Sequence, residues 1–187
     1  MYLNQFSVVI PEGNETSGGY IEMQHGKQYV VRLRNDRSVA CDAHVEIDGK
    51  NVGTWRLQAR QNATLEHPVH DQGRFTFYRL GSVEAEQAQL SNSPNLGLVK
   101  VTFTPGYAPR PLSTPMVSYS SYSGQSVMRG AGGTGLSGHS NQHYGVAREI
   151  ELDYSQQTVI HLRLIEASNV VRPLTQFSSP VPPLVYA

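Results

Sequence analysis

Apolar and polar residues alternate along much of the chain with the period of two that is typical of a half-buried β-strand. In residues 28–34, Tyr29, Val31 and Leu33 fall on one side, and Arg32 and Arg34 fall on the other. Residues 43–47 repeat this pattern. The same alternation predicts further strands over residues 74–78, 98–103 and 158–164, and weaker ones over 5–10 and 19–23.

Turn and helix signals divide these strands. Asp48-Gly49 separates residues 43–47 from a second alternating segment, 50–57, and predicts a β-hairpin because both turn residues tolerate positive φ. The helical signal is confined to residues 82–90, which are rich in Ala, Glu and Gln. About eight short strands separated by Gly, Pro and Asn clusters predict an all-β fold, an antiparallel β-sandwich of jelly-roll type.

Two segments depart from the strand pattern. Residues 113–145 are rich in Ser, Gly and Tyr, and Arg129 is their single charged residue, so we expect a long loop. Residues 166–187 form a proline-rich C-terminal arm, for which an extended, polyproline-like backbone is favoured. The predicted organisation is one sandwich domain over residues 1–165, including the loop, followed by the arm.

The loop and the arm contain too few large apolar residues to form a core by themselves. We therefore expect both to be ordered by contacts with this subunit or with neighbouring copies. Tyrosine suits such contacts because it offers a large surface at low entropy cost. The predicted contact residues are the aromatic and apolar side chains of the two segments, Tyr119, Tyr122, Leu136, Tyr144, Pro173, Phe177, Leu184 and Tyr186.

The charge balance narrows the range of partners. Fifteen Lys and Arg offset fifteen Asp and Glu, and charged residues make up 16% of the chain, against a typical value of ~25%. This neutral chain lacks the basic surplus that phosphate binding needs, so we expect no nucleic-acid partner. The single Cys41 excludes an internal disulfide scaffold. We recognise no leader segment and no apolar run of spanning length, and expect no membrane insertion.

Several histidines and glycines invite a chemical interpretation. His67 with His70, and His139 with His143, have spacings that metal ligands use. Pro68 and the glycine-rich surroundings of the second pair favour ordinary loop histidines, so we expect no metal and no cofactor. Residues 130–138 share only their glycine content with a phosphate-binding loop, because the Gly-Lys-Ser/Thr ending is missing.

The remaining candidates favour structural roles. The carboxylates of Asp42, Glu46 and Asp48 lie on the predicted hairpin and could attract a cation, but solvent-facing charges are the favoured interpretation. We expect Trp55 in the core, with a carbohydrate platform as the alternative if it is exposed, and Cys41 packed and partly buried. No nucleophile–base pair is recognised, so we predict no catalytic residue and do not expect an enzyme.

Four stretches resemble a recurring pattern of uncharacterised β-sandwich proteins of microbes and large DNA viruses. They are VRLRNDR (31–37), VEIDGKNVGTWRL (45–57), RFTF (74–77) and GGTGLSG (132–138). The overall layout is similar to that of single jelly-roll viral structural proteins, such as minor capsid, penton or spike components. The resemblance spans roughly residues 28–165, implies a β-sandwich, and carries no catalytic residue, because a shared fold does not fix function.

These observations predict a structural protein that assembles with copies of itself, and with other structural proteins of the same assembly, through the loop and the arm. A virion or another extracellular or surface assembly is the expected location, with the cytoplasm as the alternative. The alternative function is a glycan- or receptor-binding β-sandwich module, in which Trp55, Tyr119, Tyr122 or Tyr144 would contact the ligand.

Overall fold

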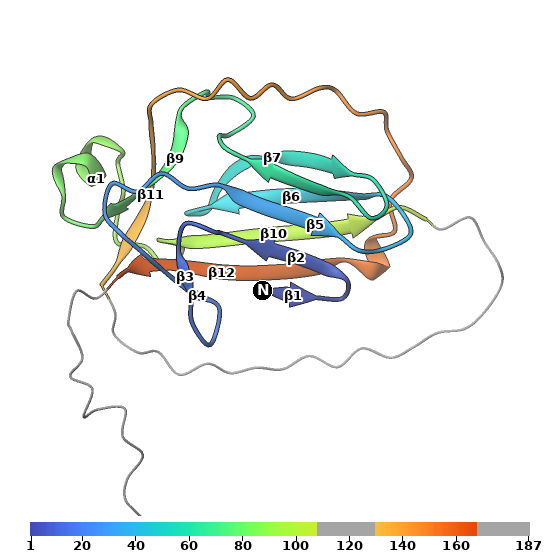
Figure 1. The fold of residues 1–187 in the computed structure, drawn as a ribbon, viewed down its shortest axis with the longest axis horizontal. Coiled ribbons are helices and arrows are strands. Elements are labelled where there is room, and N and C mark those ends of the chain that lie inside the picture. The colour runs from blue at the N-terminus through green and yellow to red at the C-terminus, as the bar shows by residue number, and fades with distance from the viewer. Residues whose placement is uncertain (108–129, 168–187) are drawn as a thin grey trace, which may run out of the picture.

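Two β-sheets packed face to face form the body of the protein (Figure 1). The computed structural model describes residues 1–107 and 130–167. The four-stranded sheet has the order β1-β2-β5-β8 and comprises β1 (Tyr2–Leu3), β2 (Phe6–Val9), β5 (Val31–Asn35) and β8 (Asn62–Leu65). The larger sheet has the order β3-β4-β12-β10-β6-β7 and comprises β3 (Asn14–Glu15), β4 (Tyr20–Met23), β12 (Thr158–Glu166), β10 (Leu98–Pro105), β6 (Cys41–Ile47) and β7 (Lys50–Leu57).

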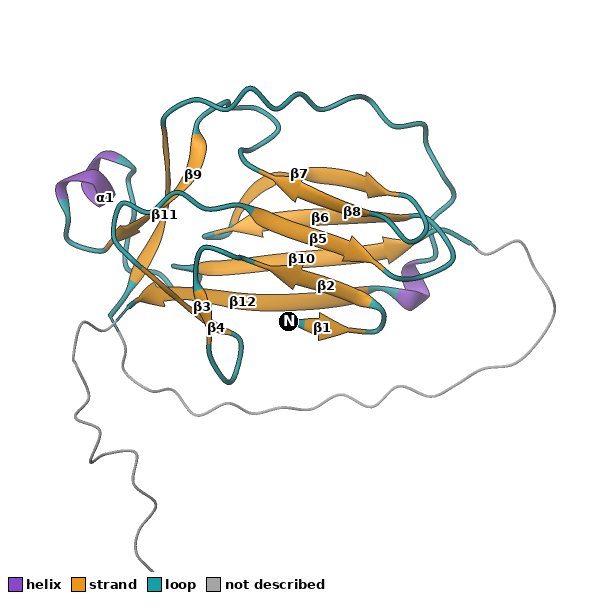
Figure 2. Cartoon of the chain, viewed as in Figure 1, coloured by secondary structure: helices purple, strands orange, loops and turns teal. Residues whose placement is uncertain are grey.

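A third, two-stranded sheet and a short helix lie at one end of the sandwich, and a 3₁₀ turn lies at the other (Figure 2). The small sheet pairs β9 (Arg74–Arg79) with β11 (Gly132–Ser137), and α1 (Val83–Gln87) lies beside it. Ser82 caps the helix by accepting a hydrogen bond from the backbone N–H of Ala85. The 3₁₀ turn, η1 (Tyr154–Gln156), precedes β12. No helix in the described ranges is both long and apolar enough to cross a membrane.

The core lies between the two large sheets. Phe6 of β2 stacks on Phe103 of β10, with ring centroids 4.5 Å apart. The alternation along β6 is strict, since every second side chain from Cys41 to Ile47 is buried. The all-β, sandwich-like prediction is therefore confirmed. The predicted strands over 43–47, 50–57, 74–78, 98–103 and 158–164, and the two weaker ones, all coincide with observed strands.

The 113–145 prediction needs a correction. Its described part is not one continuous loop, because Gly132–Ser137 forms strand β11, antiparallel to β9. The polar strand β8 was also not foreseen, because a strand of sequence NATL lacks the apolar alternation that marked the others. Residues 108–129 of the predicted loop, and residues 168–187 of the predicted arm, lie outside the described residues.

Candidate functional site

The β6–β7 hairpin positions a partly buried carboxylate at the end of the sandwich. Asp48 and Gly49 form its turn with φ values of 53° and 75°, the left-handed backbone that the Asp-Gly signal predicts. The carboxylate of Asp48 accepts hydrogen bonds from the backbone N–H groups of Gly97, at 2.5 Å, and of Thr134, at 2.6 Å. Asp48 thus joins the hairpin to the start of β10 and to β11, instead of facing solvent as predicted.

The glycines of β11 permit close packing against β9. A Cβ atom on Gly132 would lie 2.2 Å from the Phe77 ring, and one on Gly135 would lie 2.5 Å from the Tyr78 ring. Both distances are too short for a real carbon–carbon contact. The glycine-rich sequence of residues 132–138 therefore serves strand packing, and the phosphate-loop interpretation does not apply to it.

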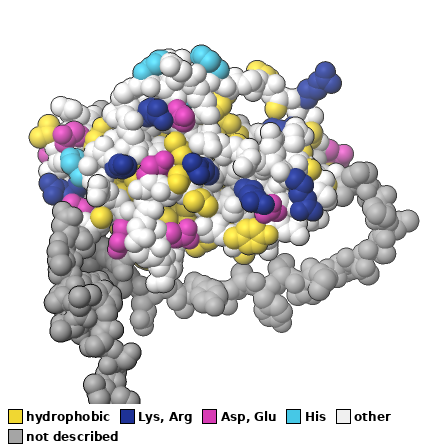
Figure 3. Space-filling view, viewed as in Figure 1, with side chains coloured by type: hydrophobic (Ala, Val, Ile, Leu, Met, Phe, Trp, Pro, Cys, Tyr) yellow, Lys and Arg dark blue, Asp and Glu magenta, His cyan; other side chains and the backbone are white. Residues whose placement is uncertain are grey.

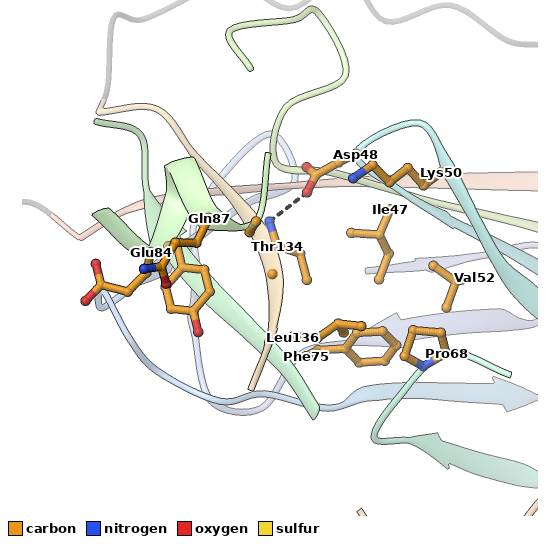
Figure 4. A pocket seen from close by; sticks show the side chains of 13 residues that line it. Ile47, Asp48, Lys50, Val52, Pro68, Phe75, Glu84, Gln87, Thr134 and Leu136 are labelled. Atoms are coloured by element: carbon orange, nitrogen blue, oxygen red, sulfur yellow. Dashed lines mark hydrogen bonds between the residues drawn. The ribbon is translucent and has the colours of Figure 1, made fainter. Parts of the chain in front are cut away.

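A pocket of about 400 Å³ opens between the hairpin, β9, β11 and α1 (Figure 4). Its floor is apolar and includes Val52, Phe75 and Leu136, with Ile47 and Pro68 beside them. Its rim is polar, with Asp48 and Lys50 on one side and Glu84 and Gln87 on the other. Tyr78 also lines the pocket. This size and this mixture of an apolar floor with a few polar groups are typical of small-molecule binding sites.

A β-bulge brings Val52 into this pocket. Val45 pairs with Gly53 and Glu46 pairs with Asn51, so Val52 is the extra residue on β7. Such bulges bend a strand and redirect a side chain. Gly53 is required beside it, because its φ is +147° and an added Cβ would lie 2.3 Å from Val69.

Burial governs the electrostatics at this end of the sandwich. Burial raises the pKa of Asp48 above that of an ordinary Asp side chain, and the hydrogen bonds from Thr134 and Gly97 only partly offset the effect. Tyr29, whose hydroxyl is 2.6 Å from the Thr134 hydroxyl, is fully buried, and burial raises its pKa far above the ordinary tyrosine value. On the rim, Glu84 lies 3.6 Å from the His25 ring.

A second polar cluster fastens the extended segment 138–153 to the body. The side-chain amide of Gln142 donates to the Thr64 carbonyl, at 2.7 Å, and accepts from the Glu66 backbone N–H, at 3.0 Å. This amide therefore takes the place of a neighbouring strand along the edge of β8, which protects an otherwise open sheet edge. Tyr144 donates to the His67 carbonyl at 3.0 Å.

His67 belongs to this structural cluster. It is 3% exposed, and its ring nitrogens lie 2.6 Å from the carbonyl oxygens of Pro68 and Asp71 and 3.0 Å from that of Gln142. His70, which the sequence spacing pairs with it, is exposed. His139 and His143 are also exposed. Within residues 1–107 and 130–167, no three His, Cys, Asp or Glu side chains are grouped as a metal site requires.

The predicted contact residues fall into three groups. Leu136 is 39% exposed at the pocket described above. Tyr144 is half-buried and packs edge-on against Trp55, with ring centroids 5.4 Å apart. Those that lie outside the described residues are Tyr119, Tyr122, Pro173, Phe177, Leu184 and Tyr186.

The remaining side chains singled out from the sequence lie either in the core or in ion pairs. Trp55 is 8% exposed, so the core prediction is confirmed and the carbohydrate platform at this residue is excluded. Cys41 is packed in the core as expected, and it is fully buried where partial burial was predicted. Asp42 pairs with Arg56, and Glu46 pairs with Lys100 at 2.6 Å. Gln87 and Gln142 were missed, because a glutamine among polar residues gives no sequence signal for its role.

Three of the four stretches that carry the family resemblance meet around the pocket. Residues 45–57 supply the hairpin, 74–77 supply β9, and 132–138 supply β11. Comparison with family models, with curated proteins and with solved structures finds no match for the chain. Fold and site together define an all-β, sandwich-like protein with an amphipathic pocket between the β6–β7 hairpin, β9, β11 and α1.

Proposed function

We propose that the chain is a structural subunit that assembles with copies of itself in a virion or in another extracellular or surface assembly, on a jelly-roll type of sandwich. Its role is to bind and not to catalyse. The proposal is supported by how three polar side chains are used: the buried His67 and the partly buried Asp48 and Gln142 all bind the protein's own backbone.

Four exposed apolar residues, on segments that lie toward the η1 end, carry the proposal. We call these residues the end patch, and their exposed fractions are 36–68%: Leu3, Tyr107, Tyr154 and Val159. Hydrogen bonds hold their segments together, since Asn4 donates to Thr158 at 3.2 Å and the N–H of Tyr107 donates to the Glu151 carbonyl at 3.2 Å. Exposed apolar groups that gather in one place mark contact surfaces.

The charge distribution is compatible with association. Basic and acidic side chains are interspersed with apolar ones on the face seen in Figure 3, and the whole chain has zero formal net charge. A neutral protein lacks the mutual repulsion that keeps copies apart.

Light scattering on the purified full chain tests this function. We expect a mass of more than one copy, and a single-copy mass for the double variant Tyr154→Lys/Val159→Lys, because two ammonium groups cannot be buried unpaired at an interface. Val146→Lys is the matched control, since Val146 is fully exposed outside the end patch. A full chain that stays monomeric over a wide concentration range would contradict the proposal.

A binding module is the second candidate, and the pocket favours it. Within the described residues, no hydrogen bond is formed by the Gln87 amide or the Tyr78 hydroxyl, so both are free to bind a ligand group. A glycan array probed with the full chain separates the two functions. Glycan binding that is lost in Gln87→Ala, in a monomeric protein, would favour the module over the assembly subunit.

A further inference from the structure

We infer that the pocket of one copy receives the uncharged, proline-rich segment 177–186 from the C-terminal arm of a second copy. This inference rests on the proposed assembly and names the contact that links the copies. The segment reads FSSPVPPLVY.

The period of the segment matches an aromatic pocket. A polyproline helix has three residues per turn, so residues spaced by three share one edge. In this segment Phe177, Pro180, Pro183 and Tyr186 have that spacing, which gives an edge with an aromatic ring at each end and two prolines between. Proline-rich segments bind grooves lined by aromatic residues, and their stiff backbone loses little entropy on binding.

The pocket offers the complementary surface. Val52, Phe75 and Leu136 provide apolar contacts for the edge of the segment that carries the two aromatic rings and the two prolines. Leu136, predicted from sequence to be a contact residue, is 39% exposed there, so its side chain still has apolar surface to bury.

The rim supplies the polar groups that such a backbone needs. Pro180, Pro182 and Pro183 have no backbone N–H, so the ten residues of the segment carry ten carbonyl oxygens but only seven backbone N–H groups. Gln87 and Tyr78 provide a free amide and a free hydroxyl within the described structure, and Lys50 provides an ammonium group. All three can donate to carbonyls. The absence of charge in the segment also avoids repulsion by Glu84.

The arm is long enough to reach a neighbour. Nine residues separate Ala167, the last described one, from Phe177, and in an extended backbone they span about 30 Å. Ala167 follows β12, and the bridge between Ala131 and Ile165 places the end of β12 beside the start of β11. In a symmetric assembly each copy gives one segment and receives one, so every pocket is filled and each arm contact adds to the end-patch contact.

Two complementary full-length variants test the exchange. Leu136→Lys places a charge at the pocket and leaves the arm intact, whereas the double variant Phe177→Ser/Tyr186→Ser removes both rings of the proposed contact edge and leaves the pocket intact. We expect each alone to have a lower mass than the wild type by light scattering. A mixture of the two, one carrying an affinity tag, should restore association, because the intact arm of one binds the intact pocket of the other. Val83→Lys, which adds a charge on α1 at a residue outside the pocket lining, is the control.

Binding of a labelled peptide with the sequence of residues 172–187 provides the second readout. The arm variant should bind it, and addition of Leu136→Lys or Gln87→Ala should weaken the dissociation constant at least about tenfold, a loss of about 1.4 kcal/mol. Thermal unfolding of each variant identifies any that fails to fold, and Gln87→Ala then replaces Leu136→Lys. A multimeric wild type whose pocket variants keep their mass and bind the peptide unchanged would overturn the inference and leave the proposed function standing. A monomeric wild type would overturn both.

Discussion

The carboxylate of Asp48 and the backbone N–H of Thr134 are joined by a 2.6 Å hydrogen bond across 86 positions of sequence. The second oxygen of Asp48 accepts from Gly97 at 2.5 Å. One side chain in a hairpin turn therefore fixes the start of β10 and the glycine-rich strand β11, and both bonds support the wall of the pocket.

Replacing Asp48 by Asn should destabilise the protein. Asn keeps one acceptor and turns an amide N–H group toward a backbone donor, so we expect a loss of about 1.5–3 kcal/mol in the free energy of unfolding. Urea denaturation measures it. Glu46→Gln is the control, because Glu46 forms a partly exposed ion pair with Lys100, and its loss should cost less than about 1 kcal/mol. Equal effects of the two variants would contradict this role of Asp48.

Gly132→Ala should disturb the β9–β11 pair. The added Cβ would lie 2.2 Å from the Phe77 ring and 2.9 Å from the Tyr78 carbonyl oxygen, and the backbone group cannot move away cheaply. We expect a loss of about 1–3 kcal/mol by chemical denaturation. Gly145→Ala is the matched control, because nothing lies within 4 Å of its Cβ position and stability should stay the same or rise slightly. A neutral Gly132→Ala would show that β11 can shift away from β9.

Gln142→Ala should open the edge of β8. The amide of Gln142 pairs with both Thr64 and Glu66, so its removal leaves two backbone groups without their partner. We expect a loss of about 1–2 kcal/mol and faster hydrogen exchange at the Glu66 amide. The neighbouring Asn141 is exposed, so Asn141→Ala should change neither quantity. Unchanged exchange at Glu66 in the Gln142 variant would show that another group protects this edge.

Cys41 should resist thiol reagents in the folded protein. Burial, followed by the nearby charge of Asp42, raises the pKa of the thiol to about 12. At about pH 8 we expect no reaction with a disulfide reagent until urea unfolds the chain, because the thiolate is the reactive form. Rapid labelling of the native protein would contradict the closed packing around β6.

The raised pKa of the Cys41 thiol makes the free energy of unfolding depend on pH. Its pKa is higher in the folded state than in the unfolded state, so above about pH 8.5 the unfolded chain loses a proton that the folded chain keeps. The stability that the protonated thiol contributes is fully present below about pH 8.5. It declines as the pH rises from there toward about 12, the pKa of the thiol in the folded protein. The Cys41→Ala variant should lack this part of the decline, which parallel urea titrations at several pH values would measure.

Strands with a clear two-residue alternation were predictable, and strands defined by their neighbours were not. The pattern of β6, with Ala43, Val45 and Ile47 inward, is visible in the sequence because each of these side chains meets the core. Strand β11 has mostly glycines, whose place is fixed by the rings of Phe77 and Tyr78 on β9. No local property of residues 132–137 reveals those rings.

The candidate site was predictable to a similar extent. The Asp-Gly turn was recognised, but not the burial of Asp48, because the backbone groups that bind it come from residues 97 and 134. Leu136 was identified as a contact residue from its uncharged surroundings, whereas the pocket it lines requires three separate segments to meet.

The place of β12 in the larger sheet has a consequence for biosynthesis. This strand lies between β4, to which it is parallel, and β10, to which it is antiparallel. Until residues 158–166 leave the ribosome, β4 has no neighbour on its inner side and β10 presents an open edge. Contacts between residues so far apart in sequence form slowly, and open strand edges promote aggregation. A nascent chain that pauses before Thr158 is therefore the species of this protein most in need of a chaperone.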